Sequence, residues 1–165
     1  MQRTSAEILP QMLQYIDHVN IVVGDMPRMI AFYRDRLGLR LTREATIRGA
    51  WIDAVTGLRN VEADVAFLEL PVGPSIELLH YRSPKGARPE GLGSPSTQGF
   101  RHIAFRVEAI DPLAASLRVA GVDFLSDVQQ VPASQVDYAA TRKRLLYCRD
   151  PEGNLLEFCA MEPVG

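Results

Sequence analysis

The sequence predicts an α+β fold built from two similar halves, and three repeated features point to it. The strand-like text QYIDHVNIVV at residues 14–23 returns as QGFRHIAFRV at residues 98–107. Each of these segments is followed by an amphipathic helical stretch that stops at a glycine, and each half closes with a predicted hairpin. Each half therefore reads as a strand, a helix and two or three strands, and we expect the halves to share one β structure.

The first strand of each half has one apolar face and one mixed face. In HVNIVV, every second residue from Val19 onward is apolar, and His18 lies on the opposite face. In HIAFRV the same holds from Ile103 onward, and His102 lies on the opposite face. We expect the apolar faces to pack on the helices, so that each histidine lines the space that the other face encloses.

The helix of each half is expected to begin at an acidic residue and a proline and to end at a glycine. These signals are Asp25, Pro27 and Gly38 for the first helix, and Asp111, Pro112 and Gly121 for the second. The hairpins that follow are predicted to turn at residues 72–74 and at residues 151–153.

Two segments interrupt the repeat. The connector RSPKGARPEGLGSPSTQG is rich in Gly, Pro and Ser and is interpreted as a linker. Residues 44–62 show no clear period, and we expect either an excursion over the mouth of a cavity or an ordinary packed loop. The predicted organisation is an N-terminal extension at residues 1–14, a first module at 15–82, a linker at 83–99 and a second module at 100–162.

Length, charge and cysteine content narrow the class of protein. The chain has 165 residues, which suits one compact domain, and its net charge of −2 favours neither a nucleic-acid nor a membrane partner. The start MQRTSAEILPQML lacks the apolar core of a signal peptide, and no apolar run reaches the roughly 18 residues of a membrane span. Cys148 and Cys159 are expected as buried thiols without a disulfide, so we expect a cytoplasmic protein.

The last strand of each half contains a glutamate among apolar neighbours, where this residue type is disfavoured. Glu77 follows His18 by 59 residues and Glu157 follows His102 by 55, so each half contributes one imidazole and one carboxylate at matching places. A divalent cation would let two buried carboxylates lie side by side. The four residues together therefore predict a metal site with two nitrogen and two oxygen ligands.

Other polar residues are weaker candidates for metal or substrate binding. Glu69 competes with Glu77 but has no clear equivalent in the second half, and His80 faces away from Glu77 in the strand alternation. Further candidates are expected to contact an anionic substrate, namely Arg101, Arg142 and Tyr147.

Four segments resemble the vicinal oxygen chelate superfamily, which has the glyoxalase, bleomycin resistance and dioxygenase fold: HVNIVVGDMPRMIAFYRDRLGLRL, SIELLHY, GFRHIAFRVEAID and YCRDPEGNLLEF. The resemblance covers about residues 15–162. It implies two paired βαβββ modules that form a β cup around a metal site, often in a homodimer. It also implies that the metal ligands are His18, Glu77, His102 and Glu157.

Within this superfamily the ligand types separate the activities. The set His, Glu, His, Glu is that of bacterial glyoxalase I, a lactoylglutathione lyase, whereas methylmalonyl-CoA epimerases typically have glutamine where this chain has Glu77. Extradiol dioxygenases use two histidines and one carboxylate, and resistance proteins without metal lack the ligands. The glutathione-binding residues of glyoxalase I have no counterpart that we can place here, so the resemblance implies a glyoxalase-like enzyme.

The implied reaction abstracts a proton next to a carbonyl and passes through a metal-bound enediolate. Glu157 is expected to be the base, with Glu77 as the second choice. The expected cofactor is a divalent ion, Ni, Co, Mn, Fe or Zn, and the expected partner is a small molecule with adjacent oxygens. Three alternatives stay open: an epimerase of the methylmalonyl-CoA type, an Fe(II) extradiol-type dioxygenase, and a non-catalytic protein that binds an antibiotic or another small molecule.

Overall fold

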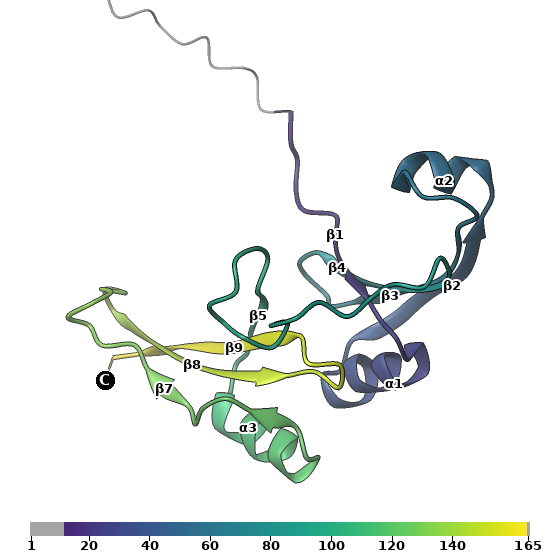
Figure 1. Cartoon of the computed structure of the whole chain (residues 1–165). Coiled ribbons are helices and arrows are strands. Elements are labelled where there is room, and N and C mark those ends of the chain that lie inside the picture. Colours follow the sequence, from purple (N-terminus) through teal and green to yellow (C-terminus); the bar gives the residue numbers. More distant parts are fainter. Residues whose placement is uncertain (1–11, 165) are drawn as a thin grey trace, which may run out of the picture.

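The protein, seen in a computed structural model that describes residues 12–164, consists of a four-stranded and a five-stranded sheet with helices packed around them (Figure 1). The first half contains β1 (His18–Val22), α1 (Met26–Ala31), the π-helical turn η1 (Phe32–Arg36), β2 (Arg40–Arg48), α2 (Ala50–Thr56), β3 (Glu62–Glu69) and β4 (Ser75–Ser83). The second half contains β5 (His102–Arg106), α3 (Ile110–Val119), β6 (Asp123–Phe124), β7 (Gln129–Gln130), β8 (Thr141–Arg149) and β9 (Leu155–Pro163).

The two sheets have the same topology, which confirms the predicted α+β class and its duplication. The strand order is β1-β4-β3-β2 in one sheet and β5-β9-β8-β6 in the other, with β7 also paired to β8. In each half the first strand pairs in parallel with the last, and the predicted hairpins β3–β4 and β8–β9 are antiparallel. Of the extension predicted at residues 1–14, residues 1–11 lie outside the described part. None of the helices within residues 12–164 combines the length and the apolar character needed to cross a bilayer.

The start of the first helix follows the prediction, and the start of the second does not. The carboxylate of Asp25 accepts a hydrogen bond from the backbone N–H of Arg28 at 3.1 Å, as a capping residue does. Asp111 lies inside the first turn of α3, and both of its carboxylate oxygens accept hydrogen bonds at 2.8 Å from the guanidinium of Arg144 on β8. The predicted cap is therefore wrong, because the bidentate ion pair takes the carboxylate.

Residues 44–62 form neither an excursion over a cavity nor a loop. Their first part extends β2 to Arg48, and α2 follows before β3 begins. Pairing with β3 along nearly its whole length stabilises β2, although the sequence of β2 lacks a clear alternation. The predictions for this segment are therefore wrong, and Trp51 on α2 is 58% exposed.

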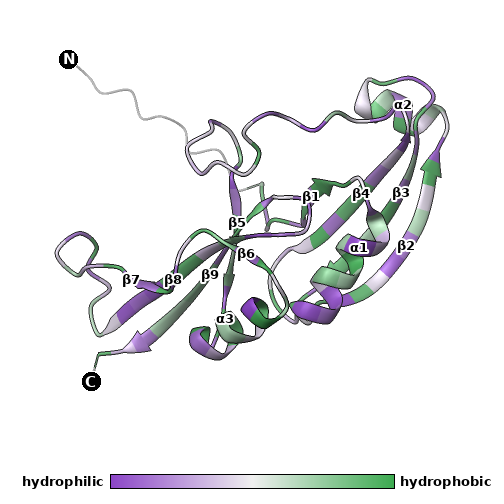
Figure 2. Ribbon diagram, turned by 60° about the horizontal axis from the view of Figure 1, so that its bottom comes forward, coloured by the Kyte–Doolittle hydropathy of each residue, from purple (hydrophilic) through white to green (hydrophobic). Residues whose placement is uncertain are grey.

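One hydrophobic core joins the two halves. It contains residues of α1, β3 and β4 from the first half and of α3, β8 and β9 from the second. Both α1 and α3 lie on this side of the sheets, and the connector between β4 and β5 arches over the opposite side (Figures 1 and 2). The opposite face of each sheet carries the predicted histidine. Neither α1 nor α3 covers this face.

Polar contacts also join the halves at the turn between β8 and β9. The fully buried Tyr33 of η1 donates its hydroxyl hydrogen bond to Asp150 at 3.1 Å, and burial raises the pKa of Asp150. The carboxylate of Glu152 accepts hydrogen bonds from the backbone N–H groups of Gly24 and Asp25 at the start of α1. The two halves are thus fixed to each other by charged and polar groups as well as by the core.

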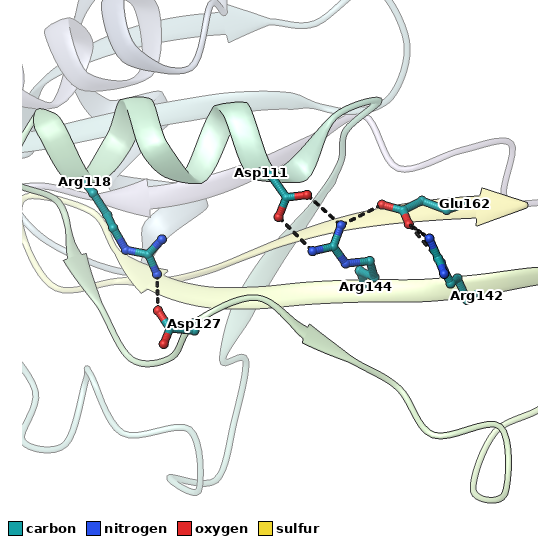
Figure 3. A network of polar contacts seen from close by, with 6 residues as sticks. All are labelled: Asp111, Arg118, Asp127, Arg142, Arg144 and Glu162. Carbon is teal, nitrogen blue, oxygen red and sulfur yellow. Dashed lines mark hydrogen bonds and ion pairs between the residues drawn. The ribbon is translucent and has the colours of Figure 1, made fainter.

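A partly exposed ion-pair network ties α3 to β8 and β9 (Figure 3). Arg144 binds Asp111 and also donates to Glu162 at 3.0 Å, and Arg142 donates to the same carboxylate at 3.0 Å. Hydrogen bonds from Arg144 are the first cause of the lowered pKa of both carboxylic acids. The network therefore favours the charged form of each acid in the folded chain.

We expect Arg144→Met to lower the melting temperature in a pH-dependent way. The pKa values of Asp111 and Glu162 are lower in the folded chain than in the unfolded chain. Their ion pairs with Arg144 therefore stabilise the fold fully above the unfolded pKa values of about 4, and this stabilisation is lost as the pH falls through the folded pKa values. The difference in melting temperature from wild type should be largest at neutral pH and vanish toward about pH 2. Arg118→Met, which breaks the separate pair with Asp127, is the control, and a difference for Arg144→Met that persists at low pH would contradict the account.

Candidate metal centre

His18 and Glu77 lie next to each other on the open face of the first sheet. His18 begins β1, Glu77 lies on the neighbouring β4, and the His18 Nε2 atom is 3.4 Å from Glu77 Oε2. The other ring nitrogen, Nδ1, lies 2.8 Å from a carboxylate oxygen of Asp17. A neutral imidazole that donates from Nδ1 presents the lone pair of Nε2, which is how carboxylates orient metal-binding histidines.

His102 and Glu157 form the corresponding pair on the second sheet. His102 begins β5, Glu157 lies on the neighbouring β9, and the distance from His102 Nε2 to Glu157 Oε2 is again 3.4 Å. Glu157 is 5% exposed and accepts a hydrogen bond at Oε1 from the ammonium group of Lys143 at 2.7 Å. This hydrogen bond is the first cause of the raised pKa of Lys143. The buried carboxylate is thus held by one cation while its other oxygen faces the histidine.

The two pairs differ in the groups that hold the glutamates. Glu77 accepts a hydrogen bond from the side-chain amide of Asn20 at 2.8 Å, whereas the residue opposite Glu157 on β5 is Ala104. The aromatic neighbours also differ: the ring of His18 lies edge-on to Phe67 at 6.1 Å, and the ring of His102 lies 5.1 Å from Tyr147. The site is therefore pseudosymmetric in its histidines and glutamates and asymmetric in the residues around them.

Within one chain the four predicted ligands form two separate pairs. Among residues 12–164, no group of three or more His, Cys, Asp or Glu side chains lies close enough to hold a metal ion. Both histidines face outward, with 40% of the His18 side chain and 35% of the His102 side chain exposed. Each pair thus offers one imidazole and one carboxylate on a face that remains accessible.

The side chains of both pairs fit a divalent metal ion. Neutral imidazoles and carboxylates are the ligands that Zn, Ni, Co, Fe and Mn accept. The Asp17 contact gives His18 the orientation of a metal ligand, and the contact with Lys143 shows that Glu157 already pairs with a positive charge.

The remaining predicted residues lie in different places. Glu69 pairs with Arg40 at the edge of the first sheet, and His80 Nδ1 lies 3.0 Å from the carbonyl oxygen of Val23 on the core side, a structural role. Arg142 points to the helix side and binds Glu162, so the prediction that it contacts substrate is wrong. Both cysteines are free thiols.

Sequence reasoning missed Asn20 and Lys143. Strand alternation puts Asn20 on the face of His18, which is a usable signal, because a polar residue facing a strand glutamate is an expected hydrogen-bond donor. Lys143 shares a face with Tyr147, but its contact with Glu157 depends on the register of β8 against β9. That register cannot be read from the strand text alone.

Known proteins are similar to this chain in sequence and in fold. Residues 15–158 match the family described as Glyoxalase/Bleomycin resistance protein/Dioxygenase superfamily. The chain is 31% identical over 147 residues to the uncharacterized protein YaeR of Escherichia coli (strain K12), covering 88% of this chain and 95% of that protein. It is similar to the crystal structure of a glyoxalase family protein from Bacillus cereus, with a TM-score of 0.77, 29% identity and coverage of 91% and 95%.

A more distant structure shows the same fold. The trypanothione-dependent glyoxalase I of Leishmania major has a TM-score of 0.62 and 21% identity, with 90% of this chain and 87% of that chain covered. The duplicated topology, the matched His–Glu pairs and the family match over most of the chain lead to one assignment. The chain belongs to the Glyoxalase/Bleomycin resistance protein/Dioxygenase superfamily.

Proposed function

We propose that the protein is a divalent-metal-dependent lyase or isomerase of the glyoxalase type, and that two copies of the chain complete its metal site. The observation that carries the proposal is the pair of equivalent His–Glu sites, each with its histidine and glutamate 3.4 Å apart on an open sheet face. Each pair offers half of a ligand set with two nitrogen and two oxygen donors.

A twofold dimer brings the two halves of the ligand set together. In an isologous dimer the first sheet of one chain faces the second sheet of its partner, and the same contact is made twice. His18 and Glu77 of one copy then meet the pair His102 and Glu157 of the other copy. The dimer holds two equivalent sites, and neither is complete in a single chain.

The side chains have distinct roles in the proposed reaction. A divalent ion held by the two pairs supplies a Lewis acid that polarises a substrate carbonyl. Glu157 takes a proton from the carbon next to that carbonyl and returns it to the adjacent carbon. Its burial limits exchange of this proton with water, and Lys143 fixes the orientation of the carboxylate. Glu77 is more exposed and is held by Asn20, which suits a residue that stays a ligand.

Metal removal tests the proposal directly. We expect purified protein to contain about one divalent ion per chain, and chelation followed by dialysis to abolish isomerisation of a hemithioacetal or proton exchange next to the carbonyl of an acyl-CoA. Readdition of Ni²⁺, Co²⁺, Mn²⁺, Fe²⁺ or Zn²⁺ should restore the activity. Metal-dependent oxygen consumption with a catechol, in place of proton transfer, would contradict the proposal and favour a dioxygenase.

Replacement of Lys143 with methionine should increase the amount by which bound metal stabilises the folded protein. Without the ammonium group the buried Glu157 carboxylate loses a charged partner, which costs roughly 1–3 kcal/mol in the free energy of unfolding of the metal-free protein. A bound cation compensates this loss, so the stabilisation by metal should be larger in Lys143→Met than in wild type.

Urea unfolding with and without metal measures both effects of Lys143→Met. Arg59→Met, which removes an exposed cation elsewhere, is the matched control. Equal stabilisation by metal in wild type and in Lys143→Met would show that Glu157 does not bind the ion.

A further inference from the structure

A cavity of about 790 Å³ lies between the two halves. Its walls are formed by β1, the end of β4, the start of β5 and the turn before β9, and residues of the connector also line it. Asn20 of the first half and His102 of the second are both part of its lining, so the cavity borders both His–Glu pairs. In the proposed dimer these two pairs belong to different metal sites, so the cavity lies between the two sites.

The cavity is rich in cationic side chains that lack a carboxylate partner. Arg28, Lys85, Arg88 and Arg101 line it, and within residues 12–164 none of the four forms an ion pair. The single carboxylate in the lining, that of Glu152, accepts hydrogen bonds from backbone N–H groups at the start of α1. The wall of the cavity thus carries an excess of positive charge.

Arg101 shows that an acceptor is missing. Its Nε atom is buried and has no hydrogen-bond partner, and one of its terminal nitrogens reaches only the carbonyl oxygen of Leu92 at 3.4 Å. Buried guanidinium N–H groups are costly to leave without an acceptor. The guanidinium of Arg101 has five N–H donors and makes only this one long hydrogen bond within the described part of the chain, so its terminal N–H groups can bind an anionic group in the cavity.

Arg88 is held in place on another wall. One of its terminal nitrogens donates to the carbonyl oxygen of Glu152 at 2.8 Å, which fixes the guanidinium and leaves other N–H groups free. A Cβ atom added at Gly153 would lie 2.7 Å from that nitrogen, so the glycine leaves room for the arginine. The cation is therefore positioned before any ligand arrives.

The remaining lining is largely apolar. It includes Val22, Phe100, Ile103 and Leu155, and the side chains of Val22 and Phe100 are 51% and 70% exposed. A ligand that covers these side chains gains free energy from burial of apolar surface. The cavity thus combines cationic groups with an apolar wall.

We propose that this cavity binds an amphipathic organic anion, a carboxylate or phosphate joined to an apolar body. Guanidinium groups match the paired oxygens of such anions, and two or more cations suit one doubly charged or bidentate group. The charged group binds Arg101, Arg88 and Lys85. The apolar body lies against Phe100 and Ile103. All side chains of this site come from one chain, and the cationic groups that bind the anion are distinct from the proposed metal ligands.

Isothermal titration calorimetry of metal-free protein tests the proposal with four probes. Phenyl phosphate and phenylacetate carry the two candidate anions, benzyl alcohol is the uncharged analogue, and inorganic phosphate lacks the apolar body. We expect at least one aromatic anion to bind about tenfold or more tightly than both benzyl alcohol and inorganic phosphate. The aromatic anion that binds with the higher affinity shows whether the cavity prefers a phosphate or a carboxylate.

Variants locate the binding. Arg101→Met and Lys85→Met should each lower the affinity for the better-binding anion by about tenfold. Arg59→Gln, which removes an exposed cation outside the cavity, should not change this affinity. Lys85 is exposed, so its replacement leaves folding unaffected even where Arg101→Met alters it. Binding of neither anion, or equal binding by Lys85→Met and Arg59→Gln, would overturn the proposal. Because the protein is metal-free, this outcome is separate from failure of the proposed catalytic function.

Discussion

Replacement of Glu157 with glutamine is expected to lower metal-dependent proton transfer by at least about 100-fold. The amide keeps the shape of the side chain but cannot accept a proton, and it is a weaker metal ligand than a carboxylate. Lys143 can still donate to the amide oxygen, so we expect the fold to persist. Turnover and metal content of the variant, measured together, separate loss of the base from loss of the ion.

The matched control for this variant is Glu69→Gln. Glu69 is a strand glutamate on β3 whose carboxylate pairs with Arg40 and accepts a hydrogen bond from Thr42, so it contacts neither His18 nor His102. Its replacement should leave turnover and metal content close to the wild-type values. Wild-type turnover in Glu157→Gln would remove Glu157 as the base and leave Glu77 as the candidate.

Replacement of Leu156 with alanine is expected to lower the free energy of unfolding by about 2–5 kcal/mol. Leu156 is fully buried on the helix side of β9, in the core cluster that contains residues of both halves. The lost methyl and methylene groups leave a cavity that neighbours from two sheets cannot both fill. The midpoint of urea unfolding should fall accordingly.

Because the core is shared, both halves should unfold in one transition, with and without the substitution. Val119→Ala on the exposed surface of α3, where the side chain is 92% accessible, should change the free energy of unfolding by no more than about 0.5 kcal/mol. Two separate transitions, or equal effects of the two substitutions, would show that the halves are independent.

Much of the fold follows from local signals. Strand alternation placed Ile21 and Phe105 in the core and the histidines on the other face, because side chains along a strand point to opposite sides. The glycines that end the helices were also predictable, since Gly38 and Gly121 have φ values of +76°. These features depend on neighbours in the sequence, and the sequence is sufficient to predict them.

Features that depend on distant partners were not predictable. Asp111 has the sequence context of a cap, yet its partner is Arg144, which is 33 residues away. Residues 44–62 take their strand from pairing with β3 and not from their own pattern. The same holds for the site: the repeat predicts one His–Glu pair in each half, but the relative position of the two sheets depends on the packing of the core and, in our proposal, on a second chain.

A heterodimer of complementary variants tests most directly whether one metal site needs two chains. One chain carries His18→Ala with Glu77→Ala, the other carries His102→Ala with Glu157→Ala, and different affinity tags allow the mixed dimer to be purified after co-expression. One of its two sites then has all four native ligands, and the other has none. We expect the heterodimer to bind about half as much metal as wild type and each parental variant to bind almost none. A heterodimer without metal, or a parental variant with the wild-type amount, would contradict the account.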